Sequence, residues 1–240
     1  MELSLEGTIA LVTGGERGVG RGITMAFQRA GATVITCARH PPERPIAEFE
    51  PCDVRDPDQV DRLLQAIIQR HGRLDTVVNN AGGAPFANAA DASPRFHDKV
   101  VGLNLLAPLL VSQRANEIMQ RQPAGGSIVM VSSVSATRPS PGTAAYGAAK
   151  AGLDNLAATL AVEWAPKVRV NTLDVGLVRT ERNEHYGEAA AVTVPLGRLA
   201  EPDEIGACAV FLASALASYV SGARLLVHGG GEAPAFLKPG

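Results

Sequence analysis

Two side chains that can move a proton lie one helical turn apart in the second half of the chain. Tyr146 and Lys150 are four residues apart, so a helix presents both on one face. A tyrosine hydroxyl ordinarily has a pKa of about 10, and a nearby lysine ammonium lowers that pKa. Such a phenol can exchange a proton with a carbon–oxygen centre whose charge changes during a reaction. Taken alone, this pair is more often found on a solvated helix face, so its surroundings must decide.

A serine precedes this pair at the predicted end of a strand. The run 128–131 is short, apolar and β-branched, which predicts a buried strand, and Ser133 follows it. Ligands of open α/β sheets bind beyond the carboxyl ends of the strands. Ser133 is therefore placed at a ligand-binding edge, which favours a site over a plain surface pair.

A glycine-rich turn follows the first predicted strand, 9–13, and opens a helical pattern that runs to Arg29. Residues 14–20 read Gly-Gly-Glu-Arg-Gly-Val-Gly. Glycines let the backbone approach a pyrophosphate, whose charge is met by the amides of a helix N-terminus. A tight turn without a ligand is the alternative, but the flanking strand and helix supply the context that a dinucleotide site requires.

The end of the second predicted strand indicates which dinucleotide binds. Sites that prefer NAD usually carry an acidic residue there for the ribose hydroxyls, whereas this chain has Ala38 and Arg39. Arg39 and Arg17 could hold a 2′-phosphate through charge-assisted hydrogen bonds, which favours NADP(H) and leaves NAD(H) open. Both arginines could equally be solvated surface residues, and Glu16 would weaken an anion site.

Short apolar runs alternate with longer helical patterns along the chain. The predicted strands are 9–13, 33–37, 76–78, 128–131, 168–173 and 225–227, with a further strand that ends near Cys52. Continuous apolar strands are typical of parallel sheets covered on both faces by helical crossovers. The sequence therefore predicts a Rossmann-type, doubly wound α/β fold with a predominantly parallel sheet of about seven strands and helices on both faces.

Proline at the first helical position marks three predicted helix starts. These are Asp56-Pro57, Ser93-Pro94 and Glu201-Pro202. The helix that carries Tyr146 is expected to run from about residue 143 to 164. No repeat or flexible linker divides the chain, so residues 1–240 are predicted to form a single domain. The stretch of about 179–199 lacks periodicity and is predicted to be a substrate lid.

Composition narrows the classes of partner. The 240 residues carry a formal net charge of −2, which argues against nucleic-acid or anionic-membrane binding and favours a small-molecule substrate. No apolar run is long enough to span a bilayer, and Glu2 and Glu6 do not fit a secretory signal, so a cytoplasmic protein is expected. Cys37, Cys52 and Cys208 lack metal-ligand spacing; they are predicted to be buried and reduced, and no metal site is predicted.

Considered together, these residues resemble the short-chain dehydrogenase/reductase family, in its single-domain type, over essentially the whole chain. The resemblance is carried by Thr13-Gly14-x-x-x-Gly18-x-Gly20, Asp53-Val54, Asn79-Asn80-Ala81-Gly82, Asn104, Ser133, Tyr146-x-x-x-Lys150, Asn171 with Gly176 and Thr180, and Pro195-Leu196-Gly197-Arg198. It implies an NAD(P)-dependent oxidoreductase that transfers a hydride between the cofactor and a ketone or secondary alcohol. A non-catalytic NADP-sensing or scaffold protein on the same fold is the alternative, since fold alone does not define function.

The resemblance also implies a role for each polar residue of the site. Tyr146 would be the general acid or base at the substrate oxygen, and Ser133 would hydrogen-bond that oxygen. Lys150 would lower the pKa of Tyr146 and hold the nicotinamide ribose, while Asn104 would bind a water in the proton path to solvent. Ser132 is the rival for Ser133, but the family's spacing to the tyrosine matches Ser133, and Ser132 is interpreted as a strand-end serine.

For the cofactor, the resemblance implies contacts along one edge of the sheet. Asp53 and Val54 would lie at the adenine, although Asp53 also fits a plain strand-end cap. Residues 80–82 would follow the adenosine ribose and pyrophosphate, and Val178 and Thr180 would lie near the nicotinamide carboxamide. The implied cofactor residues are Gly14, Arg17, Gly18, Val19, Gly20, Arg39, Asp53, Val54, Asn80, Ala81, Gly82, Tyr146, Lys150, Gly176, Val178 and Thr180.

Asn104 has a further, local argument. Pro108 lies four residues later and cannot donate the helical hydrogen bond to the Asn104 carbonyl. A kink and a free acceptor are expected there, which suits a bound water. A kink that only shapes packing is the alternative.

Three features depart from the family pattern. Val175-Gly176 stands where Pro-Gly is common, which puts the lid geometry in doubt. Glu16 replaces a small polar residue in the phosphate turn. The proline-rich stretch 39–46 is too short for the helix that many relatives carry, so the adenosine end is expected to be more open.

The substrate is the least defined part of this interpretation. Candidate pocket walls are 84–86, 135–141 and the lid with His185 and Tyr186; they are largely small or apolar, which favours a rather apolar ketone or secondary alcohol. Arg138 is a possible anion contact. Relatives usually form tetramers, and the small residues around Tyr146 and the apolar tail 234–237 could lie at such interfaces, so a homotetramer is expected; ordinary packing within one chain is the alternative.

Overall fold

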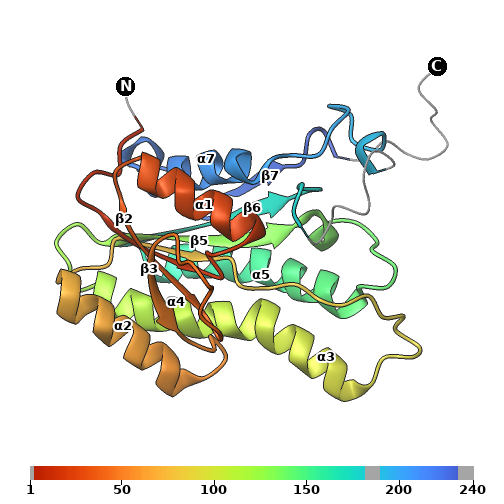
Figure 1. Cartoon of the computed structure of the whole chain (residues 1–240), viewed down its shortest axis with the longest axis horizontal. Coiled ribbons are helices and arrows are strands. Elements are labelled where there is room, and N and C mark those ends of the chain that lie inside the picture. The colour runs from red at the N-terminus through yellow and green to blue at the C-terminus, as the bar shows by residue number, and fades with distance from the viewer. Residues whose placement is uncertain (1–2, 182–189, 232–240) are drawn as a thin grey trace.

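A parallel sheet forms the centre of the computed structural model, which describes residues 3–181 and 190–231. Within these residues the sheet has seven strands in the order β3-β2-β1-β4-β5-β6-β7 (Figure 1). The strands are β1 Ile9–Thr13, β2 Thr33–Ala38, β3 Glu48–Pro51, β4 Thr76–Asn79, β5 Gly126–Ser133, β6 Val168–Val175 and β7 Arg224–Val227. Strand order reverses between β1 and β4, which is the point where ligands bind in such sheets. The predicted Rossmann-type fold is confirmed.

Helices cover both faces of this sheet. They are α1 Gly18–Arg29, α2 Pro57–His71, α3 Pro94–Val101, α4 Ala107–Met119, α5 Ala144–Glu163 and α7 Pro202–Ala213. In Figure 1, α1 and α7 lie together above the sheet, and α2, α4 and α5 lie below it. Each face has its own core: Phe27 and Ile205 are fully buried on one side, and Ile67 and Leu153 on the other. Apolar residues therefore fill both faces of the strands, as the continuous apolar runs predict.

All three predicted helix starts are confirmed. The Asp56 carboxylate accepts a hydrogen bond from the Gln59 amide at 3.2 Å, and Ser93 caps α3 in the same way. At α7 the carboxylate comes from inside the helix, because Glu204 accepts from the Glu201 amide at 2.8 Å. These side chains satisfy amides that a helix leaves without partners in its first turn.

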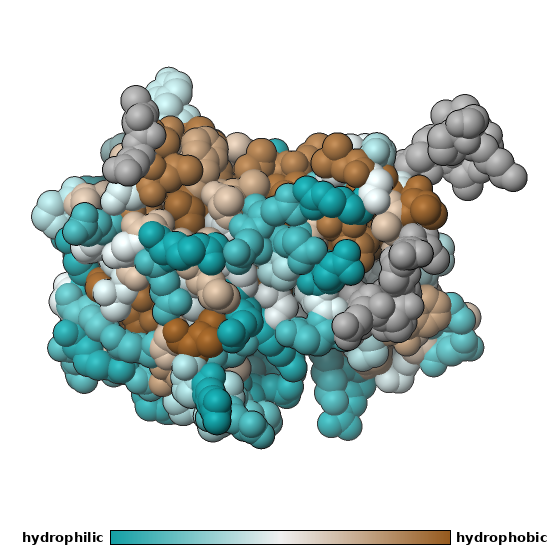
Figure 2. Space-filling view, turned by 45° about the horizontal axis from the view of Figure 1, so that its top comes forward, coloured by the Kyte–Doolittle hydropathy of each residue, from teal (hydrophilic) through white to brown (hydrophobic). Residues whose placement is uncertain are grey.

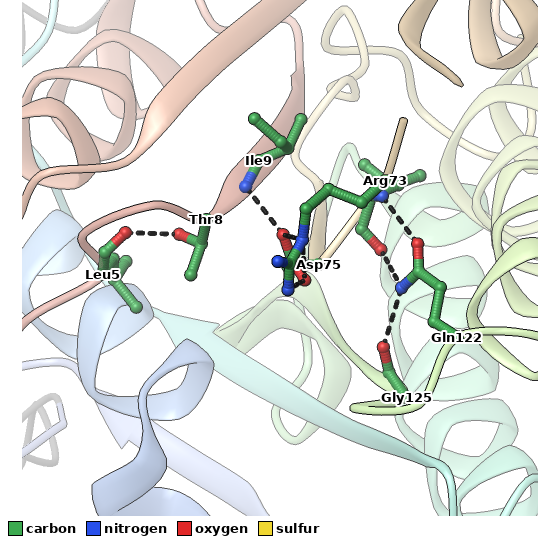
Figure 3. A network of polar contacts seen from close by, with 8 residues as sticks. Leu5, Thr8, Ile9, Arg73, Asp75, Gln122 and Gly125 are labelled. Carbon is green, nitrogen blue, oxygen red and sulfur yellow. Dashed lines mark hydrogen bonds and ion pairs between the residues drawn. The ribbon is translucent and has the colours of Figure 1, made fainter. Parts of the chain in front are cut away.

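Polar side chains fix the amino edge of the sheet, opposite the ligand-binding edge. Figure 3 shows Asp75, which pairs with Arg73 and accepts from the Ile9 amide at 2.8 Å. Gln122 hydrogen-bonds both backbone groups of Leu74, at 2.8 and 2.9 Å. The starts of β1, β4 and β5 are therefore held in register by side chains at the edge opposite the carboxyl ends of the strands.

The cysteines are closer together than their positions in the sequence suggest. Adjacent strands bring Cys37 and Cys52 into contact, and their thiol–thiol hydrogen bond raises the pKa of Cys37 and lowers that of Cys52. Both are buried free thiols, as predicted, whereas Cys208 is only half-buried, which corrects the prediction for that residue. Among the described residues, no helix is long and apolar enough to cross a membrane.

Candidate active site

Helix α5 places Tyr146 and Lys150 on one face, directed into the protein. Its many alanines favour helix formation and permit close packing. Lys150 is 3% exposed, and its Nζ donates to the Val131 carbonyl at 2.7 Å. The same nitrogen lies 5.6 Å from the centre of the Tyr146 ring. Lys150 is therefore part of the interior and Tyr146 beside it is half-buried, which excludes a solvated surface pair.

Burial changes the acid–base behaviour of Lys150. Removing an ammonium group from water disfavours its charged form. Burial lowers the pKa of Lys150 to about 8, and the charge of Asp154, one helical turn further, acts in the opposite direction. A lysine in this range can gain or lose a proton near neutral pH, beside the Tyr146 phenol.

The two serines at the end of β5 have different surroundings. Ser132 is 3% exposed, and its Oγ donates to the Lys150 backbone carbonyl at 3.3 Å. Ser133 is half-buried, and its Oγ accepts from the Ser135 amide at 3.2 Å, which caps the short 3-10 turn Val134–Ala136. Successive side chains of a strand alternate between its faces. Of the two hydroxyls, that of Ser133 is the more accessible to a substrate.

Asn104 is fully buried in a π-helical segment, Gly102–Leu106. The kink expected from Pro108 takes this form, since the Ala107 amide reaches back to the Gly102 carbonyl. The Asn104 side chain accepts from the Gly83 amide at 2.8 Å and donates to the Gly83 and Val100 carbonyls at 3.0 and 2.9 Å. Its amide group therefore holds the loop that follows β4.

The glycine-rich turn adopts a conformation that its glycines permit. Gly14 and Gly18 have φ values of 64° and 52°, a region that other residues rarely adopt. The Asn80 side chain donates to the Thr13 and Gly14 carbonyls at 2.9 and 3.1 Å. A Cβ on Gly20 would overlap both the Gly14 carbonyl and the Asn80 amide. The loop after β4 therefore holds the turn in place through Asn80. The Asn80 side chain can approach this closely because residue 20 is a glycine.

Gly82 brings the loop after β4 against Asn104 and against Lys150 of α5. A Cβ at Gly82 would lie 2.7 Å from Asn104 Oδ1 and 3.5 Å from Lys150 Nζ. Gly82, which was predicted as a cofactor residue, is therefore a neighbour of Asn104 and Lys150, which were predicted as catalytic residues. Ala81 links the same loop to the end of β1, because its amide donates to the Thr13 hydroxyl at 3.0 Å.

The adenosine end is more exposed. Arg17 and Arg39 are both exposed, which fits cations that meet a charged group from solvent and equally fits solvated surface arginines. Asp53 pairs with Arg55 at 2.6 Å, and this hydrogen-bonded partner lowers the pKa of Asp53. Val54, in contrast, is 7% exposed and belongs to the core.

Glu16 is engaged by the protein. Its carboxylate accepts from the Thr36 hydroxyl and, at 3.1 Å, from the Ile46 amide. The side chain thus ties the phosphate turn to β2 and to the proline-rich stretch 39–46, which contains no helix, as predicted.

The chain after β6 crosses the opposite end of the site. Val175, at the position of the common family proline, is the last residue of β6 and pairs with Val227. A Cβ on Gly176 would lie 2.7 Å from His228 Cβ, so glycine is needed for this close approach. Val178 is 4% exposed and bridges to Ala200.

Thr180 lies over the phosphate turn. Its methyl group lies 3.4 Å from a Cβ built on Gly18. Val19, in the first turn of α1, is half-buried against the core. The start of the predicted lid and the start of α1 therefore face one another.

A small cavity lies beside the end of β5 and the chain after β6. It is lined by Val134, Arg138, Gly176, Leu177, Val194, His228 and Gly231. Of the predicted pocket walls, Arg138 and Val194 line this cavity and residues 84–86 do not, while His185 and Tyr186 lie outside the described residues. His228 was not among the predicted pocket residues, although its place just after β7, at the carboxyl edge of the sheet, could have indicated it.

The residues present fit a dinucleotide. No side chain of the described residues caps the N-terminus of α1, and its first turn contains no acidic residue. Uncapped amides at a helix N-terminus suit a diphosphate. The described residues contain no group of three His, Cys, Asp or Glu side chains that could hold a metal ion.

Comparisons with known proteins agree with this geometry. Residues 14–232 match the family described as enoyl-(acyl carrier protein) reductase. The 3-oxoacyl-(acyl-carrier-protein) reductase FabG of Thermotoga maritima is 34% identical, over 95% of this chain and 99% of the relative. D-threitol dehydrogenase of Mycolicibacterium smegmatis is 35% identical, over 95% and 94%. The structure of aldohexose dehydrogenase from Thermoplasma acidophilum has a TM-score of 0.92 at 28% identity, over 98% of both chains.

The chain therefore belongs to the short-chain dehydrogenase/reductase family and is an NAD(P)-dependent oxidoreductase. The relatives are named as dehydrogenases or reductases, which favours an enzyme over a non-catalytic protein on the same fold.

Proposed function

We propose that this enzyme transfers a hydride between NADP(H) and a ketone or secondary alcohol, with Asn104, Ser133, Tyr146 and Lys150 as its catalytic residues. One observation carries the proposal: the buried Lys150 nitrogen lies 5.6 Å from the centre of the Tyr146 ring and donates to the Val131 carbonyl of β5, the strand that ends at Ser133. Burial of an ammonium group lowers stability, and groups whose pKa is perturbed by burial gather at functional sites.

Each residue of this set has a proposed step. When bound, the nicotinamide ring supplies or accepts the hydride. Tyr146 gives a proton to the substrate oxygen during reduction and takes it back during oxidation. Ser133 donates a hydrogen bond to the same oxygen and stabilises its developing charge. The Lys150 ammonium stabilises the Tyr146 phenolate and binds the nicotinamide ribose.

Asn104 contributes through its backbone in this proposal. Its side chain is already engaged by Gly83 and Val100. The group that would hold a water of the proton path is therefore the Asn104 carbonyl, to which Pro108 cannot donate.

For the cofactor, NADP(H) is proposed over NAD(H). The glycine-rich turn and residues 80–82 would hold the pyrophosphate, and Gly176, Val178 and Thr180 would lie near the nicotinamide. Asp53 and Val54 would lie near the adenine. Arg17 and Arg39 are exposed cations at the adenosine end, where a 2′-phosphate would need them.

For the substrate, a small and rather apolar ketone or secondary alcohol is proposed. Val134, Leu177 and Val194 supply apolar walls to the cavity, while Arg138 and His228 add a polar side. Residues 179–199 are proposed to act as a lid on a single domain of residues 1–240. The names of the relatives give three classes to test beside simple ketones: a 3-oxoacyl thioester, a polyol and an aldose.

A cytoplasmic homotetramer is proposed for the assembled enzyme. Figure 2 shows apolar side chains gathered along the upper part of the molecule, where α7 and β7 lie. On β7, Leu226 is 53% exposed, and Tyr219, between α7 and β7, is fully exposed. On α5, Val162 is 80% exposed next to exposed alanines. Light scattering after size-exclusion chromatography measures the mass; a monomer would contradict the proposal.

A substrate screen tests the function. It follows nicotinamide absorbance once at acidic pH and once at alkaline pH. NADPH with simple ketones and 3-oxoacyl thioesters tests reduction, and NADP+ with the matching alcohols, polyols and aldoses tests oxidation. Turnover in one class, with NADPH preferred to NADH in fluorescence titrations, supports the proposal. Tight cofactor binding without turnover in any class would contradict it.

A further inference from the structure

His228 lies in the wall of the small cavity beside the end of β5. It directly follows β7, and a Cβ on Gly176, which directly follows β6, would lie 2.7 Å from His228 Cβ. Val134, which directly follows Ser133 of β5, lines the same cavity. The imidazole therefore shares a small space with the residue next to the serine that is proposed to bind the substrate oxygen.

The backbone around His228 is held on both sides. Residues 229–231 are glycines with φ values of 65°, 97° and 89°, which turn the chain sharply after the strand. The Gly231 amide donates to the His228 carbonyl at 3.2 Å, and the Gly229 carbonyl accepts from the Leu196 amide at 3.1 Å. The imidazole is therefore attached between the end of a sheet strand and a hydrogen-bonded turn, which fixes its place in the cavity wall.

The imidazole has hydrogen-bonding capacity that the protein does not use. His228 Nδ1 is buried, and within residues 3–181 and 190–231 it has no hydrogen-bond partner. Most buried polar atoms in proteins have a partner, so each exception needs an explanation, such as a role toward a ligand. Because Nδ1 is enclosed by protein atoms, Nε2 is the ring nitrogen that a molecule in the cavity can reach.

Nε2 of His228 can act as a donor or as an acceptor. In a neutral imidazole, the hydrogen bond that one nitrogen makes decides which nitrogen carries the proton. Nδ1 makes no such bond with the described residues, so the proton can lie on either nitrogen. A hydroxyl group also donates and accepts, and it can therefore pair with Nε2 in both forms.

The rest of the cavity limits the molecule that can carry this hydroxyl group. The cavity has a volume of about 70 Å³, and Val134, Leu177 and Val194 supply its apolar wall. A space of this size holds a small substituent and not a long chain. A short carbon skeleton with one polar group therefore fits it.

Arg138 is the other polar side chain of the cavity. Its Nη1 donates to the Pro139 carbonyl at 3.1 Å and to Ser140 Oγ at 3.0 Å. Both acceptors belong to the loop that carries Arg138, so the guanidinium group is tied to its own wall. An anionic substituent held by Arg138 is the competing arrangement, and the experiment below includes it.

We propose that His228 is a specificity-determining residue that hydrogen-bonds a hydroxyl group on the carbon next to the reacting carbon, so that the enzyme acts on small hydroxyketones and the matching diols. This role rests on the proposed function, because Ser133 must bind the reacting oxygen for the neighbouring carbon to reach the cavity. The apolar walls contact the carbon skeleton, and His228 orients it through one polar contact.

Three ketones that share an acetyl group test this role with NADPH. Hydroxyacetone carries the hydroxyl group, butanone has a methyl group in its place, and pyruvate has a carboxylate. We expect kcat/KM to be at least about tenfold higher for hydroxyacetone than for butanone, since a site that hydrogen-bonds a hydroxyl group rejects an analogue without it. Equal values for these two ketones, or a preference for pyruvate, would overturn the proposal. Absence of turnover with all three ketones and in the wider screen would instead reject the proposed function.

Variants of His228 separate recognition from a structural role. His228→Phe keeps a ring and removes both nitrogens, so kcat/KM for hydroxyacetone should fall about tenfold while that for butanone stays within about twofold. His228→Gln retains a group that donates and accepts, and should recover part of the loss. His97→Phe is the matched control, because His97 Nδ1 is also buried without a partner among the described residues, but lies on α3 and outside the cavity lining. An equal loss for both ketones in His228→Phe would show a structural role and overturn the proposal.

Nitrogen NMR of the imidazole gives a readout that does not depend on turnover. The Tyr146→Phe enzyme with NADP+ cannot reduce a ketone, so hydroxyacetone can be added without reaction. The ring-nitrogen signals of His228, assigned by their loss in His228→Gln, should shift with hydroxyacetone and not with butanone. Equal shifts with both ketones, or none, would overturn the proposal, and this measurement also serves if His228→Phe does not fold.

Discussion

The phosphate end and the hydride end of the candidate site are built in different ways. At the phosphate end, positive-φ glycines shape the backbone and Asn80 braces it, while the cations Arg17 and Arg39 stay exposed. At the hydride end, the ionisable groups Lys150 and Asp154 are buried, and burial sets their pKa values. Backbone shape therefore prepares one end for a ligand, and the low polarity of the interior prepares the other.

The largest effect is expected on kcat, from a substitution that changes the hydride end alone. Tyr146→Phe removes the hydroxyl of the hydride end and leaves the phosphate end intact. We expect kcat to fall by about 10³-fold, since a positioned acid–base group contributes about 10²–10⁴-fold. The dissociation constant for NADPH, measured by fluorescence titration, should stay within about twofold of wild type, well below the tenfold that corresponds to 1.4 kcal/mol. Turnover close to that of the wild type would show that the ends are not divided in this way.

A measurement of the free energy of unfolding tests whether the burial of Lys150 at the hydride end lowers stability. The pKa of Lys150 is lowered by burial from 10.5 to about 8, so the unfolded chain binds more protons between these values. The buried ammonium thus lowers stability below pH 8, and this cost disappears as the pH rises towards 10.5. Lys150→Met should raise the free energy of unfolding at pH 7 by about 3 kcal/mol.

Urea denaturation of Lys150→Met at pH 7 and pH 10 measures this effect. The gain over wild type should shrink at the higher pH, where the native lysine is neutral. Lys99→Met is the control, because Lys99 is exposed and its replacement should change stability by less than about 0.5 kcal/mol. A Lys150→Met protein that is less stable than wild type at pH 7 would contradict the prediction.

A smaller effect is expected from steric change at the phosphate end. The Cβ of Gly20→Ala would overlap the Gly14 carbonyl and the Asn80 amide, which should cost about 1–3 kcal/mol in stability and weaken NADPH binding. Gly102→Ala is the matched control, because no atom lies within 4 Å of the added Cβ. Thermal unfolding and cofactor titration of both variants give the result; equal behaviour would show that the turn adapts.

The smallest effect is expected on cofactor binding, from the removal of one exposed cation at the phosphate end. Arg39→Ala should weaken NADPH binding by about fivefold to tenfold, since an exposed charged contact contributes about 1 kcal/mol, and leave NADH binding unchanged. Arg44→Ala, in the same exposed segment, should alter neither. If NADH binds more tightly than NADPH and Arg39→Ala changes nothing, the proposed contact with a 2′-phosphate is wrong.

More of the phosphate end than of the hydride end could be predicted from the sequence. Gly14 and Gly18 are recognisable because so few residues tolerate a positive φ, and the flanking strand and helix follow from apolar periodicity. The contact between the Cys37 and Cys52 thiols, in contrast, has no signal in the sequence, because it forms only when neighbouring strands of the sheet pair. The pairing of Arg224 with the buried Asp154 and Asp174 has no local signal either, because the three residues come from elements far apart in the chain.

By itself, the sequence determined the alternation of strands and helices, the glycine turn and the one-turn spacing of Tyr146 and Lys150, because these depend on backbone geometry and local periodicity. Only the tertiary structure decided that Lys150 is buried, that Ser132 and Ser133 face different surroundings, and that one arginine serves two carboxylates. Burial and charge balance arise when distant elements pack together, and no local pattern of residues encodes them.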